Sequence, residues 1–328
     1  MSESQTLVLS AADVHACLDP AAVPATVEAT LRALAEGAAD AAPRSFLPVG
    51  DGAFIAMPGH LRSRRIAGVK WASTLNGNPE RGLPKVRAAV LLCDAETGQL
   101  SAILDAREIT ALRTGALAAV AAKYCARTGA AVAAIIGFGA VGKGALRALI
   151  EMCSLREIRV FGPRREAVAA DAAEAAAASG VPVVPAASIR DAVRDADIVV
   201  TAAGLRADAP FLEDAWIRPG TVVCGLGSYQ EVDGALVTRA DKLVVDDWDA
   251  SAHRGQFAPL VAAGRLRRED VYAELPEIVC GAKRGRSSER EIIVASLLGR
   301  GVLDLAIAAE VVEQARRLGV GQHVGIES

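Results

Sequence analysis

Short apolar runs alternate with helical segments through the second half of the chain, from about residue 130 to residue 290. The runs span four or five residues, and helical patterns of apolar and polar positions separate them. This alternation is typical of a parallel sheet that is covered on both faces. The predicted strands are Val132–Ile136, Ile158–Phe161, Val181–Val184, Asp197–Thr201, Thr221–Cys224 and Lys242–Asp246, and helices are predicted at Glu166–Ser179 and Ser188–Arg194.

The first part of the chain has a different pattern, in which one amphipathic helix, opened by Pro20, precedes several short strands. The helix is predicted over Asp19–Ala39, and the strands over Ser45–Val49, Ala53–Met57, Gly68–Ser73, Arg87–Cys93 and Leu100–Asp105. Turn-forming residues separate these strands, so we expect a mixed or antiparallel sheet.

Two further helices connect these parts. One, over Ile109–Cys125, leads into the second half, and a helical stretch over Gly299–Leu318 is expected to pack back on the first part. Two domains follow: an α+β domain of residues 1–112 plus about 295–328, and an α/β domain of residues 113–294.

The first strand of the α/β domain leads directly into a G-x-G-x-x-G turn. Gly137 allows the tight turn, Gly139 lets the backbone approach a pyrophosphate, and Gly142 lets the next helix pack on the strand. Ala140 and Val141 begin that helix, whose free N–H groups face the phosphates. Because a strand precedes this motif and a helix follows it, the sequence predicts a Rossmann-type doubly wound parallel sheet that binds a dinucleotide.

Two other loops lie at the same edge of the predicted sheet. Residues 201–204 and 225–228 follow predicted strands, and ligands bind doubly wound sheets at the carboxyl ends of the strands. We therefore predict that Thr201, Leu226 and Ser228 contact the cofactor.

The end of the second strand bears on the choice between NAD and NADP. Sites for NAD usually carry Asp or Glu there, to bond the ribose 2′-hydroxyl. Gly162 stands at this position, and Arg164 and Arg165 follow. A guanidinium suits a 2′-phosphate, so we expect NADP(H) to be preferred, with NAD(H) possible. The alternative is that both arginines are solvated loop charges.

Composition narrows the possible partners. Lys and Arg number 36 against 39 Asp and Glu, a net charge of −3, which argues against nucleic acid or an acidic membrane surface as a partner. The six cysteines are scattered, and neither they nor the histidines show the spacing of metal ligands. This pattern predicts a reduced, cytoplasmic, metal-free protein. We also expect no signal peptide, and no apolar stretch is long enough to span a bilayer.

Three cations in the first domain and at the start of the second border apolar segments. Arg44 precedes a strand, Lys70 lies inside one, and Arg113 lies near the start of the connecting helix. Lys70 can extend its ammonium from the strand to solvent, and Arg113 can pair within its helix. Spacing alone leaves open whether they form a site.

The chain resembles the ornithine cyclodeaminase/mu-crystallin family over nearly its whole length. Besides the glycine turn, the matching segments are Pro43-Arg44, Met57-Pro58, Gly68–Lys70, Gly77–Pro79, Gly82–Pro84, Asp94–Gly98, Ile109–Thr114, Val244–Trp248, Glu274–Ile278, Gly285–Ser287 and Asp304. The resemblance implies a homodimer with an N-terminal substrate and dimerisation domain and a nucleotide domain. It also implies that Arg44, Lys70 and Arg113 bind the carboxylate of a small amino or imino acid.

Physical chemistry agrees with that assignment. An arginine binds a carboxylate through two parallel hydrogen bonds, which fixes the substrate for hydride transfer. A lysine between two arginines is disfavoured in its charged form, so Lys70 is a candidate general acid/base, the catalytic residue of this prediction.

Two departures from the family pattern concern the substrate and the cofactor. Ser228 stands where true ornithine cyclodeaminases carry an Asp that orients the substrate amine. Lys85 follows Gly82-Leu83-Pro84, where relatives usually carry Thr or Ser near the cofactor; whether it touches a cofactor phosphate or is exposed stays open.

We therefore expect an oxidoreductase that acts on a C–N bond beside a carboxylate. It would be a ketimine or imino-acid reductase, or an enzyme resembling the family's alanine dehydrogenases. The alternatives are an ornithine cyclodeaminase that works without the Asp and an NADPH-dependent small-molecule binding protein like mu-crystallin.

Overall fold

The computed structural model describes residues 5–204 and 209–326. It divides into two compact units, Met1–Arg113 with Arg300–Ser328 and Thr114–Gly299. The first division falls one residue from the predicted boundary at 112/113. The second falls after a strand, β15 (Ile293–Ser296), that the predicted end of the nucleotide domain at 294 would have cut.

The unit of residues 114–299 is built on a sheet in which all eight strands are parallel. Their order is β10-β9-β8-β11-β12-β15-β13-β14. This confirms the predicted doubly wound α/β fold. The strands are β8 (Val132–Ile136), β9 (Glu157–Phe161), β10 (Val183–Pro185), β11 (Ile198–Thr201), β12 (Val222–Gly225), β13 (Lys242–Val245), β14 (Ala273–Glu274) and β15 (Ile293–Ser296).

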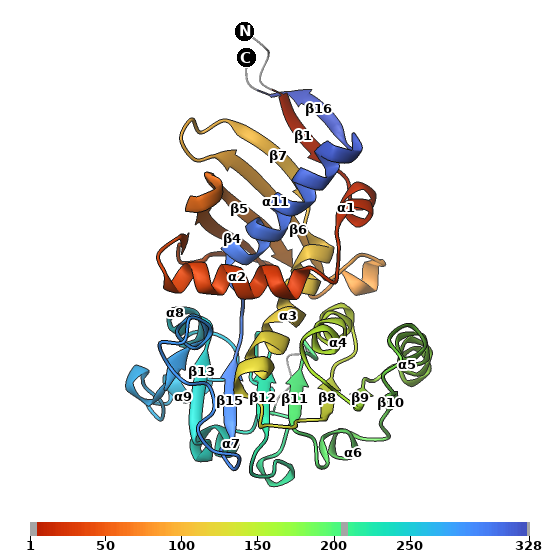
Figure 1. The fold of residues 1–328 in the computed structure, drawn as a ribbon, viewed down its shortest axis with the longest axis vertical. Helices are drawn as coiled ribbons and strands as arrows, with labels where there is room; N and C mark the ends of the chain where they lie inside the picture. The colour runs from red at the N-terminus through yellow and green to blue at the C-terminus, as the bar shows by residue number, and fades with distance from the viewer. Residues whose placement is uncertain (1–4, 205–208, 327–328) are drawn as a thin grey trace. The chain divides into compact units, whose positions relative to one another are not determined.

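Helices cover both faces of this sheet, as the continuous apolar runs predict. On one face Val132, Ala134 and Ile136 pack with residues of α6 and α7, and on the other Ile135 packs against α4 (Figure 1). The helices are α4 (Ala140–Met152), α5 (Arg165–Ser179), α6 (Ile189–Val193), α7 (Gly234–Arg239), α8 (Trp248–Ser251), α9 (Ala258–Ala262) and α10 (Leu275–Val279). The helix α3 (Arg107–Cys125) begins in one unit and ends in the other.

The other unit holds a mixed sheet, in agreement with the prediction. Its order is β16-β1-β7-β6-β5-β4-β2, with β3 paired to β4, and β1 is parallel to β7. Its strands are β1 (Gln5–Leu9), β2 (Ala39–Ala41), β3 (Ser45–Val49), β4 (Gly52–Leu61), β5 (Ile66–Thr74), β6 (Val86–Asp94), β7 (Leu100–Asp105) and β16 (Gln322–Gly325), and its helices are α1 (Ala11–Cys17), α2 (Val23–Ala35) and α11 (Gly301–Leu318).

The predicted first helix is shorter than expected. It begins at Val23 and ends at Ala35, and Gly37, at φ 71°, turns the chain into β2. Left-handed backbone conformation of this kind ends many helices. Four elements of this unit were not predicted from the sequence, the strands β1, β2 and β16 and the helix α1.

The helix α11 lies across one face of the mixed sheet (Figure 1). Two glycines bring it close: a Cβ on Gly59 or Gly68 would come within 3 Å of the side chain of Leu305. This approach sets the first turns of α11 directly against the middle of β5, where Lys70 lies.

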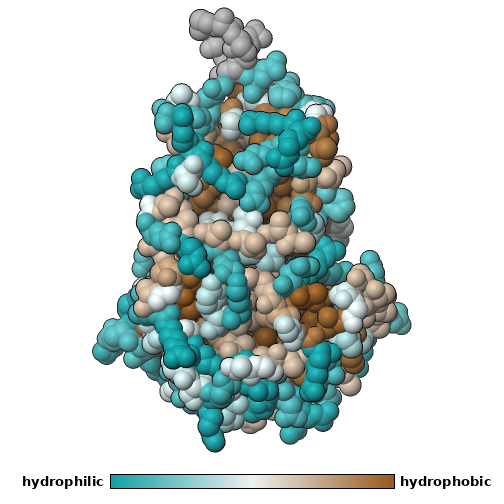
Figure 2. All heavy atoms as spheres, in the orientation of Figure 1, coloured by the Kyte–Doolittle hydropathy of each residue, from teal (hydrophilic) through white to brown (hydrophobic). Residues whose placement is uncertain are grey.

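The opposite face of the mixed sheet carries exposed apolar side chains. Leu47 is 56% exposed and Trp71 43%, and the rings of Phe54 and Trp71 stack with centroids 5.5 Å apart. Figure 2 shows the other side of the molecule, the side on which α11 covers this sheet, where hydrophilic side chains surround smaller hydrophobic patches. None of the helices in the described part of the chain is long and apolar enough to cross a membrane.

Candidate active site

A buried ionic cluster joins three elements of the first unit. Lys70 of β5 places its Nζ 2.8 and 2.9 Å from the carboxylate oxygens of Asp304 on α11. Arg113 of α3 donates from Nε to the same carboxylate at 3.1 Å. The side chains of Lys70, Arg113 and Asp304 are 1%, 4% and 0% exposed. Two residues of the predicted site, Lys70 and Arg113, are therefore brought together.

The local structure explains why this pair meets Asp304. Lys70 lies on the face of β5 that also carries Gly68, which lets α11 approach. Asp304 lies in the first turn of α11, where the helix dipole favours a negative charge. The hydroxyl of Thr110, one turn from Arg113 on α3, adds a hydrogen bond of 3.3 Å to the Asp304 carboxylate.

The environment lowers the pKa of Lys70 to about 7. Burial is the largest cause, because it disfavours the ammonium, and the positive charges of Arg113 and Arg44 act in the same direction. The carboxylate of Asp304 opposes them. A lysine with this pKa can both donate and accept a proton near neutral pH.

Asp304 keeps its negative charge. Burial works to raise its pKa, but the charges of Arg113 and Lys70, with the hydrogen bonds they donate, hold the pKa below its ordinary value. Arg44, which is half-buried in the loop before β3, lies near enough to act on Lys70. Arg113 and a partly protonated Lys70 thus face the carboxylate of Asp304, and Arg44 acts on Lys70. The cluster therefore carries an excess of positive charge that a second carboxylate would balance.

Asp304 is a member of this cluster that the site predicted from the sequence left out. It was among the residues that match the family, but the match gave it no role. A signal was present: Asp304 is an acid within Val302–Ala309, a stretch that is otherwise apolar and is buried throughout. A charge in a buried apolar helix is retained only when it is paired.

The glycine turn of the second unit has the geometry expected of a dinucleotide site. Gly137 has φ 97°, and a Cβ there would lie 2.4 Å from the backbone of Ala202. A Cβ on Gly142 would lie 2.1 Å from the carbonyl oxygen of Gly137. Around Gly139, by contrast, a Cβ would meet no described atom within 4 Å. Ala140 and Val141 then open α4, and no side chain caps its N-terminus, so these N–H groups fit a phosphate.

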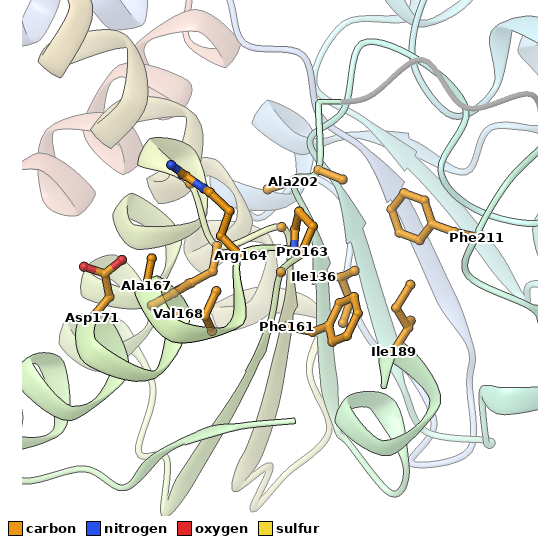
Figure 3. Close-up of a pocket in the computed structure, with 15 residues that line it drawn as sticks. Ile136, Phe161, Pro163, Arg164, Ala167, Val168, Asp171, Ile189, Ala202 and Phe211 are labelled. Atoms are coloured by element: carbon orange, nitrogen blue, oxygen red, sulfur yellow. The ribbon is translucent and has the colours of Figure 1, made fainter. Parts of the chain in front are cut away.

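A pocket of about 400 Å³ adjoins this turn. Figure 3 shows apolar side chains of Phe161, Ile189 and Phe211 around it, with Arg164 at its edge. Apolar walls with few polar groups are typical of sites for flat ring systems. A Cβ on Gly162 would lie only 3.0 Å from Val168, so the acid common at this strand end has no room without a shift of Val168. These residues fit the adenosine part of a nicotinamide dinucleotide.

The two arginines expected to bind the 2′-phosphate lie differently. Arg164 lines the pocket, whereas Arg165 is not among its lining residues and donates to the carbonyl oxygen of Ala187 at 2.9 Å. Asp171 also lines the pocket, and its carboxylate pairs with Lys143 at 2.7 Å.

The remaining predicted cofactor residues follow neighbouring strands. Thr201 ends β11 and is fully buried; Leu226 is buried and Ser228 is exposed in the loop after β12. In the other unit, Lys85 is half-buried and its carbonyl oxygen accepts from the N–H of Leu75.

This fold and this site define a nicotinamide-dependent oxidoreductase of small amino or imino acids. The chain belongs to the ornithine cyclodeaminase/mu-crystallin family, whose model matches residues 4–318. It is 33% identical to the alanine dehydrogenase of Archaeoglobus fulgidus over 98% of each chain.

Solved structures of related enzymes have a similar fold. An archaeal alanine dehydrogenase dimer with bound NAD superposes with a TM-score of 0.92 at 31% identity, covering 98% of this chain and all of the other. The Thermococcus litoralis Δ1-pyrroline-2-carboxylate reductase, in complex with NADH and L-proline, gives a TM-score of 0.91 at 31% identity, covering 97% of this chain and all of the other.

Proposed function

We propose that this protein reduces the C=N bond of a small imino acid or ketimine acid, or forms an amino acid from a 2-oxo acid and ammonia. The observation that carries this proposal is the buried excess of positive charge around Asp304. It suits a ligand with one carboxylate, and Lys70 supplies a proton-transfer group beside it.

Each residue has a distinct role in this reaction. Arg113 and Arg44 bind the substrate carboxylate and so orient the carbon–nitrogen bond. Lys70 donates a proton to the imine nitrogen, and in the reverse direction removes a proton from the amine. Asp304 holds the Lys70 ammonium in place. The nicotinamide supplies the hydride that the carbon receives.

The test is a substrate panel with purified protein and either NADPH or NADH. Cyclic imino acids and pyruvate with ammonia are the substrates, and ornithine with NAD is the control. We expect oxidation of the reduced nucleotide with at least one imine or oxo acid. Binding of nucleotide and substrate without turnover would instead favour a mu-crystallin-like binding protein.

Cyclodeamination is the second candidate, because the family includes it. The loop after β12 presents Ser228 where cyclodeaminases carry an Asp, so we propose that ornithine is converted to proline poorly or not at all. Rapid release of ammonia from ornithine would overturn this and favour the cyclodeaminase.

The pKa of Lys70 predicts opposite pH responses for the two directions of the reaction. Reduction needs the ammonium as proton donor, so its kcat is expected to fall as pH rises through about 7. Oxidation needs the neutral amine, so its kcat is expected to rise over the same range. Steady-state kinetics over about pH 5–9 measures both limbs. If the change in kcat near pH 7 persists in Lys70→Arg, it arises from the titration of another group.

We propose that NADP(H) is preferred over NAD(H), supported by Gly162 and by Arg164 at the pocket. Arg164→Ala is expected to weaken NADPH binding about 5- to 150-fold and NADH binding little, the usual range for losing a charge-assisted bond. Arg165→Ala is the matched control, because Arg165 is held at Ala187. Nucleotide fluorescence titration measures the dissociation constants of NADPH and NADH for the unaltered protein and for both variants. Tighter binding of NADH than of NADPH by the unaltered protein would contradict the preference; the two similar structures carry NAD and NADH.

We also propose a homodimer formed through the open face of the mixed sheet. Leu47, Phe54 and Trp71 make this face apolar, and burying such a patch is a common source of association. Light scattering should give twice the chain mass, and Trp71→Glu should shift the protein toward monomer. A monomeric unaltered protein would exclude the proposal.

A further inference from the structure

We infer that Glu231 and Gln256 are positioning residues, which hold the loop of residues 225–232 in the shape that presents Leu226 and Ser228 to the cofactor. The inference rests on the proposed function, because Leu226 and Ser228 are cofactor residues only by prediction. The loop follows β12 at the carboxyl edge of the parallel sheet, and both side chains lie beneath it, almost completely buried.

Gln256 uses its whole side-chain amide on this loop. Its Oε1 accepts from the N–H of Glu231 at 2.8 Å and of Val232 at 3.1 Å. Its Nε2 donates to the carbonyl oxygens of Gly227 at 3.2 Å and Tyr229 at 3.1 Å. An amide side chain has two donors and one carbonyl oxygen, so these four bonds use both ends of the group. One side chain thereby fixes four backbone positions of the loop.

Glu231 connects this loop to the loop after the neighbouring strand. Its Oε1 accepts from the N–H of Gly204 at 3.0 Å, three residues beyond the end of β11. Its own carbonyl oxygen accepts from the N–H groups of Phe211 and Leu212. Both loops that carry predicted cofactor contacts are therefore tied to one buried acid. Burial, which outweighs the hydrogen bonds it accepts, raises its pKa.

Two glycines of the loop make room for these side chains. A Cβ on Gly225 would lie 2.4 Å from Cγ of Gln256, and a Cβ on Gly227 would lie 2.3 Å from Cδ of Glu231. Real Cβ atoms do not approach carbon so closely, so each side chain occupies the space that a loop side chain would need. Leu226 lies between the two glycines and is thus held on both sides.

The experiment compares Glu231→Ala, Glu231→Gln and Gly227→Ala with the unaltered protein. Glu231→Ala is expected to raise the dissociation constant for NADPH or NADH about 5- to 100-fold, the usual range for removing a buried hydrogen-bond partner. Glu231→Gln keeps an oxygen for Gly204 and should recover most of the affinity. Gly227→Ala should resemble Glu231→Ala, because it displaces the same carboxyl group. Glu213→Gln, an exposed acid of the same unit, is the matched control.

Hydrogen exchange at residues 225–232 of the nucleotide-free protein is measured alongside. Faster exchange in Glu231→Ala with a near-normal Tm supports a positioning role, whether or not the unaltered protein binds nucleotide. Absence of nucleotide binding by the unaltered protein would instead mark failure of the proposed function. The inference would be overturned if hydrogen exchange and nucleotide affinity were unchanged in both Glu231→Ala and Gly227→Ala. It would also be overturned if Glu231→Ala lowered the Tm but left the nucleotide affinity unchanged.

Discussion

Replacing Lys70 with methionine is expected to lower kcat by about 10²–10⁴-fold, the usual contribution of a positioned acid or base. Methionine fills most of the space of the buried lysine side chain but cannot transfer a proton. The residues predicted to bind the nucleotide lie in the other unit, so the affinity for NADPH or NADH should not change. Steady-state kinetics with the best substrate of the panel, together with nucleotide titration, measures both quantities.

The proposed role of Lys70 differs from that of the arginines in the constant that each variant should change, kcat for Lys70 and KM for the arginines. A carboxylate anchor contributes in the ground state and in the transition state, so Arg113→Leu should raise KM strongly, and Arg44→Ala should do so more mildly. Lys123→Met, at an exposed position, is the control for loss of a lysine. A Lys70→Met enzyme with normal kcat and a raised KM would make Lys70 an anchor. Normal turnover by all three variants would place the active site elsewhere.

Replacing Asp304 with asparagine is expected to lower the free energy of unfolding by about 3–5 kcal/mol, the usual cost of leaving a buried charge without its partner. Asp304 is fully buried and accepts from both Lys70 and Arg113. Without it, burial and the two arginines act on Lys70 unopposed, so the pKa of Lys70 should fall below about 7. Urea unfolding and the pH profile of reduction measure the two effects.

Two further variants test whether the lost stability of Asp304→Asn comes from the unpaired cations. In Asp304→Asn combined with Lys70→Met, part of the lost stability should return, because one unpaired cation has been removed. Glu313→Gln, an exposed acid on the same helix, should unfold like the unaltered protein. If Asp304→Asn lowers the free energy of unfolding no more than Glu313→Gln does, the ionic cluster does not stabilise this unit.

The sequence by itself determined the features that depend on neighbours in the chain. Apolar runs such as Val132–Ile136 identify strands that are buried on both faces, because periodicity reflects local burial. The glycine turn is predictable for the same reason, because the positive φ of Gly137 and the close approach of Gly142 to Gly137 both lie within a turn a few residues long. The family resemblance added Arg44, Lys70 and Arg113, which spacing alone had left undecided.

Only the tertiary structure decided which distant residues meet. β15 enters the sheet between β12 and β13, an order that no local pattern specifies. Asp304 binds Lys70 although 234 positions of sequence separate them. Glu231 and Gln256 occupy the space beside Gly225 and Gly227, which the positions of these glycines in the sequence do not reveal. Arg164 and Arg165 are adjacent and chemically identical, yet only Arg164 lines the pocket. These contacts depend on packing between elements that are far apart in the chain. The packing decides which side chains are buried and therefore which pKa values shift, whereas the local pattern decides only where helices and strands form.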